Sequence, residues 1–215
     1  MKKILVLITT FMFLTIGAKA GVNVGISLKQ LDIETSGSEK LKTNNVGSMT
    51  KVSEDATVGE IFIEAQNDNG FAVGVALIPG EAEIGAKTTS RTDKLTSGSS
   101  TVSQKAQAEI SGHVTAYAIL PVMSAGYLKL GAGSVDVETN EKLGTGAKYG
   151  NASVSFGTVA LGFQKTNDNG LFFRGEVGYT DYEEVVLKST GSDAASTIKG
   201  DISHTHGKIS IGKAF

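Results

Sequence analysis

Charged side chains recur at alternate positions within otherwise apolar segments of this sequence. Arg174 and Glu176 lie two residues apart and Glu60 and Glu64 lie four apart, so in an extended chain each pair faces one side. The set with this placement holds four acids and four bases: Lys29, Glu60, Glu64, Glu109, Lys129, Arg174, Glu176 and Lys208. Unpaired charges are costly in an enclosed space. We therefore predict that these side chains form one mutually satisfied network of ion pairs.

Residues that could support catalysis or metal binding are few. His204 and His206 offer two imidazoles on one side of a strand, but two ligands do not complete a metal site, so we expect them at a solvated loop end. A neighbouring Ser and His could act as a nucleophile and its base, and Ser111 and His113 lie two residues apart. However, His113 is expected to face the interior in the middle of a strand. The segment Gly131–Gly133 lacks the third glycine and the helix of a dinucleotide site. The sequence therefore predicts no catalytic residue, no cofactor and no metal.

The segments that carry these charges have the period-two pattern of β-strands. Val159, Leu161 and Phe163 share one face before a turn that ends in Asn-Asp-Asn-Gly170, and the alternation resumes after it. Asn and Gly supply the positive φ that a tight hairpin turn needs. The same four residues end at Gly70, between two further alternating segments. The chain is therefore predicted to be a series of such hairpins.

Long and short connections separate the alternating segments in strict order, from a first strand at Val22–Ile33 to a last strand that ends at Phe215. This order predicts eight antiparallel strands, with short turns at one end and four longer loops at the other. The glycine count of 27 and the proline count of 2 suit many strands and turns. The stretches predicted as polar loops are residues 35–57, 85–105, 140–151 and 188–203.

Closing such strands into a barrel leaves the direction of the two faces open. If the apolar faces point to lipid, Ile110 and Val177 lie outside, and the charged set fills a lumen that is wide enough only for side chains. The network is then either a structural plug or a narrow gated pore whose ion pairs rearrange. If the apolar faces point inward, the chain is a soluble, lipocalin-like barrel that binds a small apolar ligand, with Arg174 and Glu109 outside.

Aromatic residues gather near the predicted strand ends and turns. They predict either the interfacial girdle of a membrane barrel or ordinary core packing. Trp is absent, so such a girdle would be incomplete. The residues concerned are Phe62, Phe71, Tyr127, Phe163, Phe172, Phe173, Tyr179 and Phe215.

The start of the chain has the pattern of a secretory signal peptide. Two lysines precede an apolar run, and a small-x-small site ends at Ala20, so cleavage is expected before Gly21. We predict that residues 1–20 are removed on export and that residues 21–215 form one barrel domain. The sequence contains no cysteine, and its net charge of −2 gives no basic patch for nucleic acid.

The last strand carries a second sorting signal. Ile209, Ile211 and Phe215 share a face, and a terminal Phe on an alternating strand resembles the signal read by outer-membrane assembly machinery. Lys213 departs from that pattern, in which the third residue from the end is apolar or aromatic, although Lys at a strand end can reach the lipid headgroups. We therefore expect this strand to engage the assembly machinery.

Together, these features resemble the small eight-stranded outer-membrane barrels of Gram-negative bacteria, the group that includes the opacity proteins and outer-membrane proteins A, W and X. The resemblance covers essentially the whole mature chain and implies an all-β, up-and-down transmembrane barrel in the outer membrane, surrounded by lipid. It implies a structural or surface role, or a narrow pore. Because candidate catalytic residues are few, we expect that the protein is not an enzyme. We expect a monomer without a nucleic-acid partner. A soluble periplasmic or secreted barrel that binds a small apolar ligand is the alternative.

Overall fold

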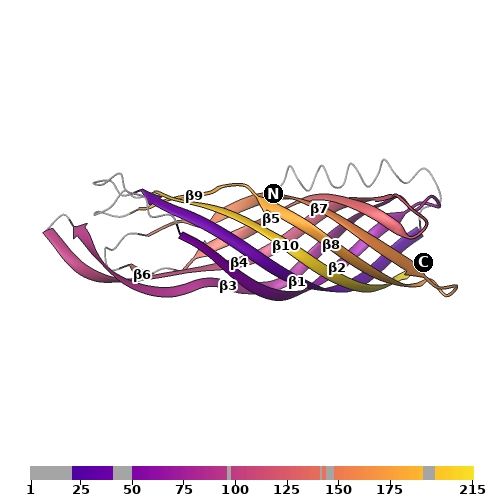
Figure 1. The fold of residues 1–215 in the computed structure, drawn as a ribbon, viewed down its shortest axis with the longest axis horizontal. Coiled ribbons are helices and arrows are strands. Elements are labelled where there is room, and N and C mark those ends of the chain that lie inside the picture. Colours follow the sequence, from indigo (N-terminus) through magenta and orange to yellow (C-terminus); the bar gives the residue numbers. More distant parts are fainter. Residues whose placement is uncertain (1–20, 41–49, 96–97, 141, 144–147, 191–196) are drawn as a thin grey trace.

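The structure is a computed structural model that describes residues 21–40, 50–95, 98–140, 142–143, 148–190 and 197–215 (Figure 1). Eight long antiparallel strands follow one another around a wall, and the first pairs with the last to close it. They are β1 (Gly21–Lys40), β2 (Thr50–Gln66), β3 (Ala72–Leu95), β4 (Gly98–Pro121), β5 (Gly126–Thr139), β7 (Ala152–Thr166), β8 (Leu171–Tyr182) and β10 (Thr197–Ala214). The short strands β6 (Lys142–Leu143) and β9 (Val185–Lys188) pair with β4 and β10. The predicted eight-stranded up-and-down barrel is confirmed.

Both Asn-Asp-Asn-Gly segments form the predicted tight turns. The side-chain oxygen of Asn67 accepts hydrogen bonds from the backbone N–H groups two and four residues later, at 3.1 and 3.0 Å. Asn167 does the same at 3.1 and 2.9 Å. The closing glycines have φ values of 82° at Gly70 and 76° at Gly170, a left-handed conformation that glycine adopts without steric cost. These turns fix the register of the β2–β3 and β7–β8 hairpins.

The strands run further than the sequence pattern predicts. Residues 35–57 and 85–105 were expected to be loops, but β1 continues to Lys40, and β3 and β4 stay paired as far as Leu95 and Gly98. These stretches are rich in Ser and Thr, and a ladder of backbone hydrogen bonds needs no apolar face to continue. Alternation therefore marks only part of each strand. The predicted signal peptide lies outside the described residues.

The two faces of the wall separate apolar from charged side chains. Ile26, Leu161 and Val177 point outward with 59%, 59% and 65% of their surface exposed, whereas Glu64 and Arg174 point inward with 1% each. This direction is opposite to the one that a lipocalin-like barrel requires. Within the described residues, no helix is both long enough and apolar enough to cross a membrane.

A β-bulge at Gly112 reverses this alternation in the upper part of β4. Gly112 has a φ of 62°, and the β4–β5 register shifts between Ser111 and Val114. Ile110 precedes the bulge in the sequence. The alternation predicted that it faces lipid, but it packs against an interior cluster of valines. Glu109 therefore faces the opposite side, where Asn140 donates a hydrogen bond of 3.3 Å to its carboxylate. The predictions for Ile110 and Glu109 were wrong because the bulge adds one residue to the strand.

Interior aromatic rings lie directly on glycines of neighbouring strands. A Cβ atom at Gly162 would overlap the ring of Tyr127 and would lie 2.8 Å from the carbonyl oxygen of Gly175. By contrast, Gly157, on the same strand, has nothing within 4 Å of such an atom. Gly162 therefore makes room for the ring, and Gly157 does not serve this purpose.

This contrast yields a prediction about stability. Gly162→Ala is expected to lower the free energy of unfolding by about 1–3 kcal/mol, because a rigid ring and a backbone carbonyl must both move. Gly157→Ala, the matched control on the same strand, should change it by less than about 0.5 kcal/mol. Urea titration of the folded barrel in lipid vesicles measures both. Equal effects of the two substitutions would show that ring packing at Gly162 does not limit stability.

Candidate functional site: a filled lumen and an apolar cavity

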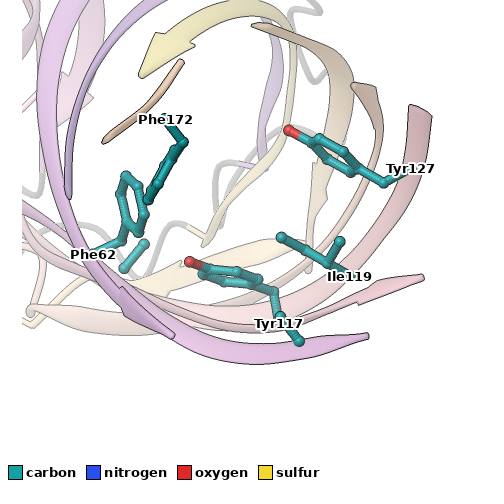
Figure 2. Close-up of a cluster of buried hydrophobic side chains, with 7 residues drawn as sticks. Phe62, Tyr117, Ile119, Tyr127 and Phe172 are labelled. Carbon is teal, nitrogen blue, oxygen red and sulfur yellow. The ribbon is translucent and has the colours of Figure 1, made fainter. Parts of the chain in front are cut away.

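The turn end of the lumen is closed by a cluster of aromatic and small apolar side chains. They come from β2, β3, β4, β5 and β8 and point towards one another across the barrel (Figure 2). The two phenylalanine rings, Phe62 and Phe172, pack with centroids 6.2 Å apart. We call this cluster the aromatic base: Phe62, Ala72, Ala76, Tyr117, Ile119, Tyr127 and Phe172. Of the residues considered for an interfacial girdle, Phe62, Tyr127 and Phe172 thus belong to the core.

Arg174 and Glu64 form a two-pronged ion pair at the aromatic base. The two terminal nitrogens of Arg174 donate to the two carboxylate oxygens of Glu64 at 2.6 and 2.9 Å. Gln164 accepts a bond of 3.1 Å from the Arg174 Nε, and the Tyr117 hydroxyl donates to Glu64 at 2.7 Å. The guanidinium also lies 5.2 Å from the centre of the Phe172 ring. Such a bidentate pair, fully hydrogen-bonded, is the arrangement that a buried charge requires.

Glu176 is the centre of a second group of ion pairs next to the first. Its carboxylate lies 2.9 Å from the Nζ of Lys208 and 3.4 Å from that of Lys129, and it accepts a bond of 3.0 Å from Tyr127. Lys208 also pairs with Glu60 at 3.1 Å. The ammonium of Lys129 lies 4.0 Å from the centre of the Tyr117 ring, which links this group to the aromatic base.

Seven of the eight charged residues predicted to share the lumen are buried inside the barrel: Lys29, Glu60, Glu64, Lys129, Arg174, Glu176 and Lys208. Glu109 is the exception, because of the bulge. The expected balance of four acids and four bases thus becomes three acids and four bases among the buried residues. Lys29 forms no hydrogen bond or ion pair with any described residue, although Glu60 and Glu176 attract it from a distance. Lys29 is therefore the buried cation that has no ion pair among these residues.

A tier of histidines lies on the other side of these ion pairs. The Tyr182 hydroxyl bridges His113 Nε2 at 3.3 Å and His204 Nδ1 at 3.4 Å, and the His113 ring stacks on Phe156 with centroids 4.5 Å apart. His206 lies 3.8 Å from Glu176. The prediction that His204 and His206 are at a solvated loop end was wrong, because β10 begins at Thr197 and places both inside the barrel. No group of metal-binding side chains occurs among the described residues.

Above the histidines the lumen opens into a cavity of about 430 Å³. Its wall is mostly apolar, and its floor carries Lys29, His113 and His204. The larger aliphatic residues of the wall are Leu31, Ile33, Val58, Ile78, Ile110, Val135, Val137, Val154 and Ile202. A volume of this size lies within the usual range for small-molecule sites. Because Ile110 was expected outside and 35–57 in a loop, the sequence pattern did not reveal this cavity.

The cavity reaches the wall between β2 and β3. Among the described residues, these strands pair only from Ile61–Leu77 to Gln66–Ala72. Beyond this point β2 stays paired with β1, and β3 stays paired with β4. Pro79 has no N–H to donate and Gly80 has a φ of 95°, so β3 bulges here and leaves β2. Residues 54–59 of β2 and 78–81 of β3 both line the cavity. We call this separation the β2–β3 gap.

The residues of the predicted assembly signal lie on the outer face. Ile209, Ile211 and Phe215 have 54%, 49% and 76% of their surface exposed. Lys213 donates a hydrogen bond to the backbone oxygen of Asn169, in the β7–β8 turn. The terminal strand is thus joined to β1 and β8 with its apolar side outward. Recognition by assembly machinery stays a prediction.

Comparison with known proteins supports the fold. No family model and no curated protein matches the sequence. Among solved structures, the outer-membrane protein OprG of Pseudomonas aeruginosa is 15% identical, over 93% of this chain and 98% of that chain, with a TM-score of 0.52. The outer-membrane protease OmpT of Escherichia coli (12% identity, 91% and 97% covered) and outer-membrane protein AlkL (12%, 92% and 91%) have TM-scores of 0.45 and 0.46. The likeness to OprG shows that the chain has the fold of a small outer-membrane β-barrel.

Proposed function

We propose that this protein admits small, largely apolar molecules into the outer membrane through the β2–β3 gap, without a chemical step. The observation that carries the proposal is the apolar cavity, which is closed below and reaches the wall between two unpaired strand edges. Molecules would enter from the loop end, collect in the cavity and leave sideways.

The lumen below the cavity favours a sideways route over a pore along the axis. The ion pairs and the aromatic base fill it with buried side chains drawn from strands around the wall. An apolar solute would have to pass through paired charges on this path, and dehydrating them is costly. A narrow pore whose ion pairs rearrange, which the sequence left open beside a purely structural role, has no comparable opening among the described residues to support it.

The height of the gap also suits release into lipid. Going along β2 from the turn end to the loop end, Ile61 is the last large apolar residue that points outward. It is also the last residue that pairs with β3. On β1, the outward face changes from Leu28 to Gln30 at the same level, since Leu28 pairs with Gly59. The gap therefore begins at the border of the outward-facing apolar band that is nearer the loop end, where acyl chains meet headgroups.

Closing the gap is expected to abolish entry. The chain has no cysteine, so Gly59→Cys with Pro79→Cys gives one pair of thiols on the two edges, which a short bismaleimide can join. In cells that carry the protein in their outer membrane, entry of the apolar fluorophore N-phenylnaphthylamine should then fall to the level measured in cells without the protein. The unlinked double variant should behave like the wild type.

The control pair is Gly157→Cys with Asp181→Cys, which joins β7 and β8 where their ladder is continuous. Linking it should leave entry unchanged. Entry that survives linkage of the β2–β3 pair would contradict a sideways route. Steady single-channel conductance of the wild type in a planar bilayer would favour the axial pore in its place.

A further inference from the structure

The floor of the apolar cavity carries an excess of positive charge. In the part of the chain that the structure describes, three buried carboxylates face four buried cations in the lumen. Arg174 is paired with Glu64, and the two remaining carboxylates are shared by Lys208 and Lys129. Lys29 is left without an ion-pair partner among the described residues, yet only 6% of its surface is exposed. A buried, unpaired ammonium is costly, and such groups are usually matched by a counter-ion.

Lys29 borders both the ion pairs and the cavity. It pairs in register with Lys208 of β10 on one side and with Val58 of β2 on the other, so it lies at the level where the gap begins. It lines the cavity beside His113 and His204. An anion that pairs with Lys29 would therefore lie at the bottom of the cavity, where a ligand can reach this side chain.

Some buried imidazole nitrogens at this floor also lack a hydrogen-bond partner. Within the described residues, the buried side-chain atoms without a partner are the Nδ1 atoms of His113 and His206 and the Nε2 of His204. Tyr182 has one hydroxyl proton and bridges two imidazoles, so it donates to one and accepts from the other. In the neutral pair, one of the two outer nitrogens, on His113 or His204, then carries a proton with no acceptor. The floor thus combines an unpaired cation with an unused N–H donor.

The other residues of the cavity determine which kind of molecule fits above the charged floor. Its wall is aliphatic, and its acidic residues, Glu54, Asp55 and Glu81, are exposed at the rim, away from the floor. We infer that the cavity binds amphipathic carboxylates, with the carboxylate on Lys29 and the apolar body against the aliphatic wall. The inference rests on the proposed function and names the class of molecule that the same cavity takes.

The three histidines are the only ones in the chain and all lie inside the barrel, so their ring signals in nuclear magnetic resonance report on this floor. The full chain in lipid nanodiscs is titrated with octanoate and, separately, with octanol, which has the same apolar body without the charge. The His113 and His204 signals should shift with both ligands. Octanoate should bind at least tenfold more tightly, which corresponds to about 1.4 kcal/mol.

Lys29→Gln tests the residue itself. It should weaken octanoate binding at least tenfold and change octanol binding less than twofold, whereas Lys165→Gln, at an exposed lysine near the β7–β8 turn, should change neither. Equal affinity of the wild type for the two ligands would overturn the inference and needs no variant. Equal weakening of both ligands by Lys29→Gln would overturn it as well. If neither ligand shifts the signals, the cavity does not take apolar molecules, and the proposed function fails with it.

Discussion

Replacing Glu64 with Gln is expected to lower the free energy of unfolding by about 3–5 kcal/mol. The substitution keeps the shape of the side chain but leaves the guanidinium of Arg174, which is 1% exposed, without its counter-ion. Gln164 and the aromatic rings around Arg174 cannot replace a negative charge. Urea titration in lipid vesicles measures the loss, and migration on a gel without heating shows what fraction stays folded.

An ion pair on the surface of the same protein provides the control. Lys199 and Glu184 lie 2.8 Å apart, but their side chains are 52% and 42% exposed. Lys199→Ala should therefore cost about 0–1 kcal/mol. A loss for Glu64→Gln as small as that for Lys199→Ala would mean that water screens the lumen, and the description of the lumen as a closed plug would be wrong.

The sequence pattern predicts the wall of this barrel well because one physical rule governs most of it. In the part surrounded by lipid, each outward residue must be apolar, so alternation identifies the strands and places Arg174 and Glu176 inside. Asn and Gly mark the two tight turns for a reason that is equally local. Beyond the apolar belt neither face must be apolar, and the pattern no longer distinguishes the upper strands from loops.

The cavity depends on two irregularities that the sequence shows only faintly. A glycine inside a strand can signal a bulge, but Gly112 is one of many strand glycines, and several of the others lie against a neighbouring ring instead. The Pro79–Gly80 pair is a stronger signal for a break in pairing. Which neighbour β3 leaves is decided by the packing of three strands, and no local pattern contains that information.

Glu176→Gln is expected to destabilise the barrel by about 3–5 kcal/mol, for a reason that involves the whole lumen. The substitution removes the carboxylate that Lys129 and Lys208 share and leaves two acids among four cations. Because an amide keeps the size of the carboxylate, the loss reports on charge more than on packing. Unfolding by urea measures it.

A second substitution separates charge balance from local contacts. Adding Lys29→Met to Glu176→Gln removes a cation that has no hydrogen bond to any residue the structure describes and that Glu176 attracts only from a distance. In the double variant the excess of positive charge is smaller, so we expect it to recover about 0.5–3 kcal/mol relative to Glu176→Gln alone. Lys165→Met, at an exposed position, should recover nothing. If Lys29→Met also recovers nothing, the lumen does not act as one electrostatic unit, and Lys29 needs no anionic ligand to balance it.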